Sequence, residues 1–299
     1  MTLPIGVTVS ASVRGDFRVA ARSGAYPEDG QVIVEAGSWE RTGTWVDYVT
    51  GASVLLAHEG IFEHGVSLSI ASDLPPGAGL ASSAALCVAL VQAFARLGGV
   101  TLDPPRVAAL ARTIETDFVG APVGLMDPLA ALGQPNRAQL IDFLTGTTTA
   151  VAMPAAVQIE IVDSGIAHEN RAGGYAARRG ECARACELLG VASLREVDGD
   201  ETAAARLPDP LARRVRHVRS ENQRVREAAE ALGAGDVARF GALLTASHAS
   251  LRDDFEVSLP AIDAIVTRAL AQPGVVGARL TGGGFGGSVV IARATPPRP

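Results

Sequence analysis

Alternating apolar and polar residues predict β-strands in the first part of the chain. Residues 66–72 alternate in this way, and similar short runs lie within residues 5–35. Turn-forming residues at 27–30 separate these runs, as in strands joined by short loops. Residues 5–35 are therefore predicted to form a meander of strands.

Apolar residues at helical spacing predict helices along the rest of the chain. The first covers residues 45–60 and places Trp45, Tyr48 and Val49 on one face. Further helices are predicted over residues 84–94, 106–116, 211–232, 236–250 and 258–270, the last with Ser258 as its N-cap. Apolar runs that favour strands lie at 138–143, 157–163, 275–281 and 289–293.

This mixture of strands and helices predicts an α+β fold with two domains. A polar, threonine-rich stretch connects the strands at 138–143 and 157–163, and we place a domain boundary there. The predicted domains are residues 1–155 and residues 156–299. With 299 residues, 47% of them hydrophobic, the chain is long enough for one large or two modest hydrophobic cores.

A loop that contains glycine follows the strand at 66–72. Two prolines end the strand, two glycines allow backbone angles that other residues avoid, and Ser82 and Ser83 stand where the next helix begins. A helix N-terminus presents free N–H groups and the positive end of its dipole, so this arrangement favours anion binding. A serine hydroxyl there can also help to hold Mg²⁺ bound to phosphates. The alternative is a tight turn with a serine N-cap.

A second glycine loop, TGGGFGG at residues 281–287, precedes the apolar run at 289–292. Three consecutive glycines carry a large cost in backbone entropy, which argues against an incidental turn. A bulged turn between two strands would explain the loop structurally. Because a first glycine loop precedes residues 84–94, we interpret the second as a wall of a nucleotide-phosphate site. The first loop is not a Walker A motif, since no Gly-Lys-Ser/Thr follows it.

Two carboxylates are candidates for chemistry, and each has a structural alternative. Asp127 lies in an apolar stretch, where an unpaired carboxylate would be costly to bury. As an N-cap followed by Pro128 at the first helical position, it would simply begin a helix. Glu115 lies near the end of the helix predicted at 106–116, where a lone glutamate is usually a solvated residue.

Composition narrows the class of protein. The net charge of −6 argues against nucleic acid and anionic membranes as partners. The sequence contains no lysine, which excludes chemistry that depends on a Schiff base or a P-loop lysine. Three cysteines and no signal peptide favour a cytoplasmic protein, and no apolar run is long enough to span a membrane. Cys182 and Cys186 are one helical turn apart, but no nearby ligand completes a metal site, so we interpret them as packing residues.

In combination, these motifs resemble the GHMP small-molecule kinases, which include galactokinase, homoserine kinase and mevalonate kinase. Residues 75–85, PPGAGLASSAA, resemble the second signature of that family, and residues 281–287 resemble the third. Stretches that resemble galactokinase in particular lie at 45–51, 118–132, 138–143, 173–197 and 247–258. The resemblance covers most of the chain. It implies the two-domain GHMP-kinase fold with an active site in the cleft between the domains, and phosphorylation of galactose by ATP at the anomeric hydroxyl.

The resemblance also implies roles for individual residues. Asp127 matches the catalytic aspartate, which would take or orient the proton of the hydroxyl that attacks the γ-phosphate. Ser83 and Glu115 match ligands of Mg²⁺. Gly124, Asp127 and Tyr175 match residues at the sugar. The residues matched to ATP binding are Trp45, Pro76, Gly77, Ala78, Gly79, Leu80, Ala81, Ser82, Ser83, Gly282, Gly283 and Gly284. For Trp45 and Tyr175, the alternative role is packing. We expect the protein to be a monomer.

The sequence departs from the family pattern at three places. The first signature, which precedes a segment like residues 3–7, is absent, and so are the usual helix and strand after the third signature. Proline at 128 replaces the usual glutamine. Either the start of the coding sequence is misassigned, or the chain is a shortened relative. A kinase of another sugar or small alcohol, and a catalytically impaired ligand-binding paralogue, therefore stay open as alternatives.

Overall fold

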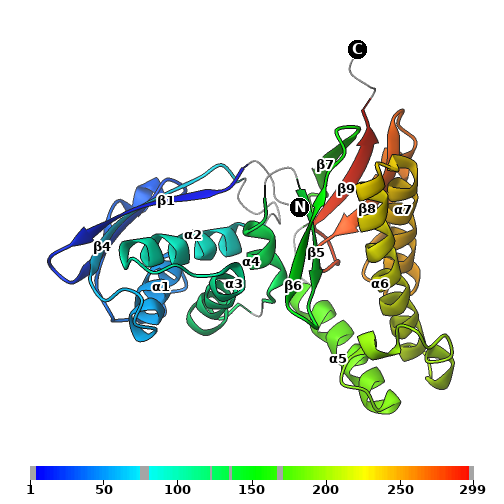
Figure 1. The fold of residues 1–299 in the computed structure, drawn as a ribbon, viewed down its shortest axis with the longest axis horizontal. Helices are drawn as coiled ribbons and strands as arrows, with labels where there is room; N and C mark the ends of the chain where they lie inside the picture. The colour runs from blue at the N-terminus through cyan, green and yellow to red at the C-terminus, as the bar shows by residue number, and fades with distance from the viewer. Residues whose placement is uncertain (1–4, 75–80, 122, 135–136, 167–170, 296–299) are drawn as a thin grey trace. The chain divides into compact units, whose positions relative to one another are not determined.

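The computed structural model describes residues 5–74, 81–121, 123–134, 137–166 and 171–295. Contacts divide the chain into two compact units, residues 1–141 and residues 142–299 (Figure 1). The boundary predicted from the sequence, between residues 155 and 156, lies after this division. Within the described ranges, no helix combines the length and the apolar character that a membrane span requires.

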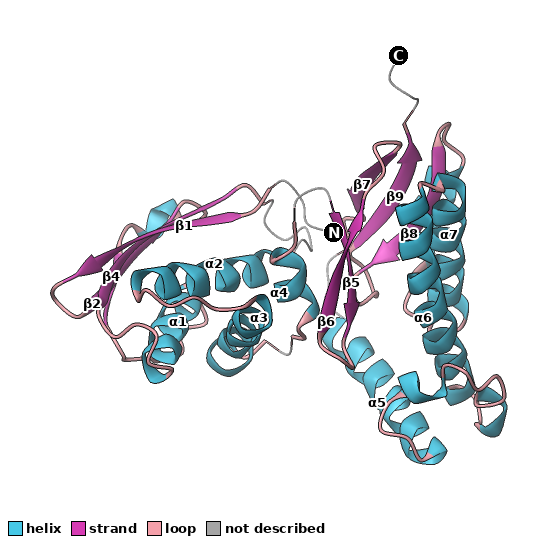
Figure 2. Ribbon diagram, in the orientation of Figure 1, coloured by secondary structure: helices cyan, strands magenta, loops and turns pink. Residues whose placement is uncertain are grey.

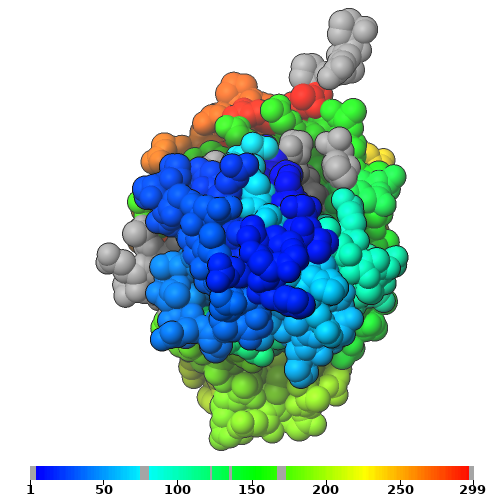
Figure 3. All heavy atoms as spheres, turned by 90° about the vertical axis from the view of Figure 1, so that its left-hand side faces the viewer, coloured from blue at the N-terminus to red at the C-terminus, as the bar shows by residue number. Residues whose placement is uncertain are grey.

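The first unit is built on a four-stranded sheet with the strand order β1-β4-β2-β3 (Figure 2). The strands are β1 (Val7–Arg14), β2 (Arg18–Ser23), β3 (Val32–Glu35) and β4 (Gly65–Ser72). The prediction of a simple meander is wrong, because β4 inserts between β1 and β2, antiparallel to the first and parallel to the second. Strand β1, in the darkest blue, lies at the surface of this unit in Figure 3.

Helices cover one face of this sheet (Figure 2). They are α1 (Val46–His58), α2 (Ser82–Leu97), α3 (Pro104–Thr113) and α4 (Met126–Ala131), with a π-helical turn, η2 (Ile114–Val119), after α3. The apolar residues of β4, which alternate along the strand, join Leu90 and Phe94 of α2 in one hydrophobic core, where both α2 side chains are fully buried. Burial of such side chains stabilises the unit by about 1.5–3 kcal/mol each. The core thereby fixes the helix whose first turn carries Ser82 and Ser83.

Helix α3 begins before the residue predicted from the sequence. The prediction started the helix at Arg106, but Pro104 is its first residue and the Asp103 carboxylate caps it by accepting from the Arg106 N–H at 2.8 Å. Proline suits the first helical position because no N–H is needed there. The last turn then runs directly into η2, which carries Glu115.

A two-stranded sheet formed by β5 (Arg137–Asp142) and β6 (Thr147–Ala152) follows. Strand β5 confirms the strand predicted at 138–143. Strand β6 corrects the interpretation of the threonine-rich stretch as a connection. Threonine is β-branched and polar, so it suits an exposed strand as well as it suits a loop.

The second unit has a three-stranded antiparallel sheet with the order β7-β9-β8, and its strands are β7 (Val157–Asp163), β8 (Val275–Thr281) and β9 (Ser288–Ala294). Its α-helices are α5 (Arg171–Leu189), α6 (Leu211–Ala234), α7 (Val237–Asp253) and α8 (Pro260–Leu270). Two short 3-10 turns, η3 (Leu194–Val197) and η4 (Ala204–Arg206), also belong to this unit, whereas a third, η1 (Pro27–Asp29), belongs to the first unit. Strands β8 and β9 flank the second glycine loop, as predicted.

The start of α8 differs from the prediction. Leu259, not Ser258, precedes the first helical residue, and the Ser258 hydroxyl donates to the Asp263 carboxylate at 2.6 Å. Pro260 again occupies the first helical position. The serine therefore stabilises the first turn through a side chain instead of through a backbone N–H.

Candidate active site

The first turn of α2 has the geometry of an anion site. Ala81 adopts left-handed backbone angles, with φ 55° and ψ 39°, and no side chain caps the helix from that position. The first N–H groups of an α-helix have no partner within the helix, and the helix dipole favours an anion there. The other predicted loop residues, Pro76, Gly77, Ala78, Gly79 and Leu80, lie outside the described residues.

Glu115 is a buried carboxylate at this site. Its side chain in η2 is 1% exposed, and Oε2 has no hydrogen-bond partner among the residues that the structure describes. Burial raises the pKa of Glu115, a hydrogen bond with Ser83 opposes the increase, and the Asp127 charge adds to it. The alternative of a solvated glutamate is therefore wrong. A buried, unpartnered carboxylate oxygen beside a hydroxyl suits a hard cation such as Mg²⁺.

Asp127 lies in the first turn of α4 and is half-buried. Leu125 occupies the N-cap position and Met126 is the first helical residue, so the alternative that Asp127 caps this helix is wrong. Pro128 fits the first turn, where its missing N–H breaks no hydrogen bond. Asp127 is close enough for its charge to act on Glu115, so the structure brings together Ser83, Glu115 and Asp127.

Tyr48 is a residue of this cluster that the sequence did not single out for chemistry. It comes from α1, and burial together with the nearby Cys87 and Glu115 raises its pKa to about 12, while a hydrogen bond with Ser83 opposes this. The sequence signal for Tyr48 was its place on the apolar face of a helix, which indicates packing. The structure adds a hydrogen bond between the Tyr48 side chain and Ser83, which joins α1 to the first turn of α2.

Trp45 and Gly124 have contrasting surroundings. The Trp45 side chain is 7% exposed, donates from Nε1 to the Asp29 carboxylate at 2.6 Å, and stacks on Tyr26 with ring centroids 6.1 Å apart. These contacts support its packing role, and its role at adenine stays a prediction. Gly124 is exposed, and an added Cβ would meet no atom of the described residues within 4 Å.

In the second unit, the glycine loop takes the backbone angles that its sequence suggests. Gly282 and Gly284 have φ values of 81° and 79°, which side chains disfavour. A Cβ at Gly284 would lie 2.5 Å from Val257. Tyr175, in the first turns of α5, is 52% exposed, which argues against the alternative that it is a packing residue.

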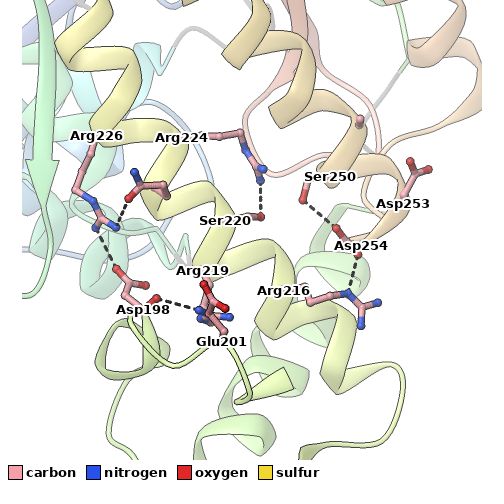
Figure 4. Close-up of a pocket in the computed structure, with 12 residues that line it drawn as sticks. Asp198, Glu201, Arg216, Arg219, Ser220, Arg224, Arg226, Ser250, Asp253 and Asp254 are labelled. Atoms are coloured by element: carbon pink, nitrogen blue, oxygen red, sulfur yellow. Dashed lines mark hydrogen bonds and ion pairs between the residues drawn. The ribbon is translucent and has the colours of Figure 1, made fainter. Parts of the chain in front are cut away.

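The second unit also contains a polar pocket of about 680 Å³, with walls from α6, the end of α7 and the segment after η3 (Figure 4). None of the predicted site residues that the structure describes lines this pocket. Its arginines already have partners: Arg216 pairs with Asp254, Arg219 donates to the Val197 carbonyl, Arg224 pairs with Glu221 and Arg226 pairs with Asp198. The walls of this pocket are therefore held together by ion pairs and hydrogen bonds among their own residues.

The two cysteines of α5, Cys182 and Cys186, are free thiols of intermediate exposure. The Cys182 thiol has its pKa raised to about 11, mainly by burial and by Cys186. Among the described residues, no group of three or more His, Cys, Asp or Glu side chains is arranged to hold a metal ion.

Comparisons with known proteins identify the family of this chain. The GHMP kinases N terminal domain matches residues 47–134, and the GHMP kinases C terminal domain matches residues 228–292. A galactokinase from Chloroflexus aurantiacus is 40% identical over 298 residues, which cover 97% of this chain and 76% of that protein. A galactokinase from Mycobacterium bovis (strain BCG / Pasteur 1173P2) is 42% identical over 296 residues, with 97% and 81% covered. A galactokinase from Roseiflexus sp. (strain RS-1) is 45% identical over 254 residues, which cover 82% of this chain and 65% of that protein.

Solved structures show the same relationship. The crystal structure of Lactococcus lactis galactokinase complexed with galactose matches with a TM-score of 0.86 and 29% identity, over 98% of this chain and 78% of that one. The mevalonate kinase of L. major, at 19% identity and a TM-score of 0.62 over 97% and 78%, shares the fold. By sequence and by structure, the chain belongs to the galactokinase family of the GHMP kinases.

Proposed function

We propose that this chain transfers the γ-phosphoryl group of ATP to the anomeric hydroxyl of galactose. The observation that carries the proposal is the cluster of Ser83, Glu115 and Asp127 at the start of α2, in a chain of the galactokinase family. In this reaction the hydroxyl oxygen forms a bond to phosphorus, the bond from phosphorus to the bridging oxygen breaks, and ADP leaves.

Asp127 acts on the proton of the attacking hydroxyl. Its carboxylate accepts or orients that proton, so that the negative charge that develops on the sugar oxygen is directed toward phosphorus. Asp127 lies in the first turn of α4, which fixes its backbone, and its half-buried side chain stays accessible to a substrate. Gly124 and Tyr175 bind the sugar in this proposal, and both are exposed.

Ser83 and Glu115 hold the metal ion in this proposal. The unpartnered Oε2 of buried Glu115 and the Ser83 hydroxyl are hard oxygen donors from two elements. Mg²⁺ bound there would supply positive charge to the phosphate oxygens. The N–H groups at the start of α2 offer further hydrogen bonds to phosphate. The proposal also assigns phosphate contacts to Gly282, Gly283 and Gly284, and it assigns Trp45 to the nucleotide site.

A substrate panel tests the proposal. Purified protein is incubated with ATP and Mg²⁺ together with galactose, glucose, mevalonate or homoserine, and ADP release is measured with a no-acceptor control. We expect galactose to give the highest kcat/KM and the product to carry phosphate at the anomeric oxygen. Release of ADP with mevalonate or homoserine but not with galactose would overturn the proposed substrate, and ATP binding without ADP release for any acceptor would overturn the proposed activity.

A further inference from the structure

The glycine loop of the second unit takes its shape from a neighbouring segment, residues 254–257. The Phe285 N–H donates to the Val257 carbonyl at 2.8 Å, and Gly284 packs so closely on Val257 that no side chain would fit. Left-handed or related φ values occur at Gly282, Gly284, Phe285, Gly286 and Gly287. The loop has no helix or strand pairing between residues 282 and 287, so a displacement of Val257 would move it.

Arg214 of α6 holds this segment from inside the unit. Its side chain is 1% exposed, and all three of its nitrogens donate. Nη1 donates to the Asp254 carbonyl at 2.5 Å, Nη2 to the Glu256 carboxylate at 2.6 Å, and Nε to the Glu181 carboxylate of α5 at 2.6 Å. A planar guanidinium makes three such bonds in fixed directions, whereas a lysine ammonium cannot reproduce them.

Arg178 of α5 holds the same segment from the other side. It donates to the carbonyls of Phe255 at 2.6 Å and Glu256 at 3.2 Å, and it pairs with Glu181 at 3.0 Å. Its guanidinium also lies 5.9 Å from the centre of the Phe285 ring. We call Arg178, Glu181, Arg214 and Glu256 the arginine clamp. The clamp joins α5, α6 and residues 254–257, and it contacts the glycine loop directly through Phe285.

This geometry includes a backbone conformation that needs support. Glu256 has φ 54° although it is not glycine, and such left-handed angles persist where surrounding contacts hold them. Two arginine side chains bind its carboxylate, because Arg213 donates to Oε1 at 2.6 Å while Arg214 donates to Oε2. Without these bonds, the turn that presents the Val257 carbonyl to the glycine loop would lose its main restraints.

We propose that Arg214 is a positioning residue that sets the affinity for the nucleotide by fixing residues 254–257 and, through them, the glycine loop. This inference rests on the proposed function, in which Gly282, Gly283 and Gly284 contact the phosphates of ATP. Arg214 does not touch substrate. Its effect reaches the loop through Glu256 and Val257. The ion pair between Arg178 and Glu181 within α5 does not involve Arg214.

Two variants test the proposal at different degrees of disruption. R214K keeps the buried charge but loses the three-point fork. E256Q changes a carboxylate whose side chain is 39% exposed, so it weakens the clamp without emptying the core. R226K is the matched control, because Arg226 lies on the same helix and pairs with Asp198 at 3.1 Å, away from the clamp. KM for ATP, KM for galactose and the melting temperature are measured for each.

We expect R214K and E256Q to raise KM for ATP about tenfold, since a small misplacement of a binding loop has effects of this size. KM for galactose should stay within about twofold of wild type, and R226K should match wild type in both constants. A merely structural role would lower the active fraction, and therefore kcat, with both KM values unchanged. That pattern, or equal changes in both KM values, would overturn the proposal.

Calorimetric titration with a non-hydrolysable ATP analogue and Mg²⁺ separates this inference from the proposed function. If wild type binds the analogue but does not phosphorylate galactose, the proposed function fails, and the inference still predicts a Kd about tenfold higher in E256Q. If E256Q binds the analogue as tightly as wild type does, the inference fails, whatever the turnover. Absence of binding by wild type would contradict both.

Discussion

At the scale of single residues, Glu115 shows how burial prepares a group for a ligand. Its carboxylate is almost fully buried, with one oxygen unpartnered among the described residues, and such a group costs free energy unless a cation or a proton accompanies it. Ser83 and Asp127 lie beside it. The sequence identified these three residues through a family resemblance, and it could not show that Tyr48 also binds Ser83, because an apolar helix face indicates packing alone.

Replacement of Glu115 by glutamine should therefore preserve the stability of the metal-free protein but weaken its response to Mg²⁺. We expect the melting temperature of E115Q without metal to equal or exceed that of wild type, because a neutral amide of the same size replaces a buried carboxylate. The Mg²⁺ concentration for half-maximal activity should rise by about tenfold or more.

Asp117, an exposed residue of the same π-helical turn, provides the control for E115Q. D117N should leave both the melting temperature and the Mg²⁺ dependence unchanged. If E115Q has the Mg²⁺ dependence of wild type, Glu115 is not a metal ligand.

At the scale of elements, the sequence predicted most helices and strands but not all of their ends or pairings. It placed the start of α8 at a serine cap and the start of α3 at Arg106, and in both helices a proline occupies the first position instead. It could not show that β4 inserts between β1 and β2, since strand order depends on contacts between residues far apart in the chain. It also interpreted the exposed strand β6 as a connection.

Close contact between α7 and β8 depends on two glycines. A Cβ added at Gly241 would lie 2.2 Å from the Val276 carbonyl oxygen, and one at Gly277 would lie 2.1 Å from the Gly241 carbonyl oxygen. We therefore expect G241A to destabilise the second unit by about 1–3 kcal/mol through overpacking, measured as a shift in the urea-unfolding midpoint.

Gly233, in α6, provides the control for G241A, because an added Cβ there would meet no atom within 4 Å in the part of the chain that the structure describes. G233A should be neutral or stabilising by about 0.5–1 kcal/mol, as alanine favours the helix. Equal effects of the two substitutions would show that α7 and β8 do not pack as described.

At the scale of the whole molecule, titration of His217 should make the second unit sensitive to acid. The imidazole is 5% exposed, hydrogen-bonds Ser250 at 2.9 Å and stacks on Phe255. Burial lowers the pKa of His217 to about 4, from 6.5, although the charge of Glu221 opposes this. Between these pH values the unfolded chain binds more protons than the folded one, so stability is present above pH 6.5 and is lost as the pH falls toward 4.

The expected loss from this one group is about 2 kcal/mol between pH 7.5 and pH 5. It is measured as the difference in urea-unfolding midpoint between the two pH values. H217Q should show a smaller difference than wild type, whereas H58Q, at an exposed position in the last turn of α1, should not. An unchanged pH dependence in H217Q would contradict the assignment.

The central claim is that Asp127 promotes phosphoryl transfer from ATP to galactose, and the most direct test compares ADP release by wild type and D127N at saturating ATP, Mg²⁺ and galactose. Asparagine has the size of aspartate but is a poor proton acceptor, so we predict a fall in kcat of about 10²–10⁴-fold with nucleotide binding retained. Turnover of D127N within a few-fold of wild type, or no galactose-dependent ADP release by wild type, would contradict the account.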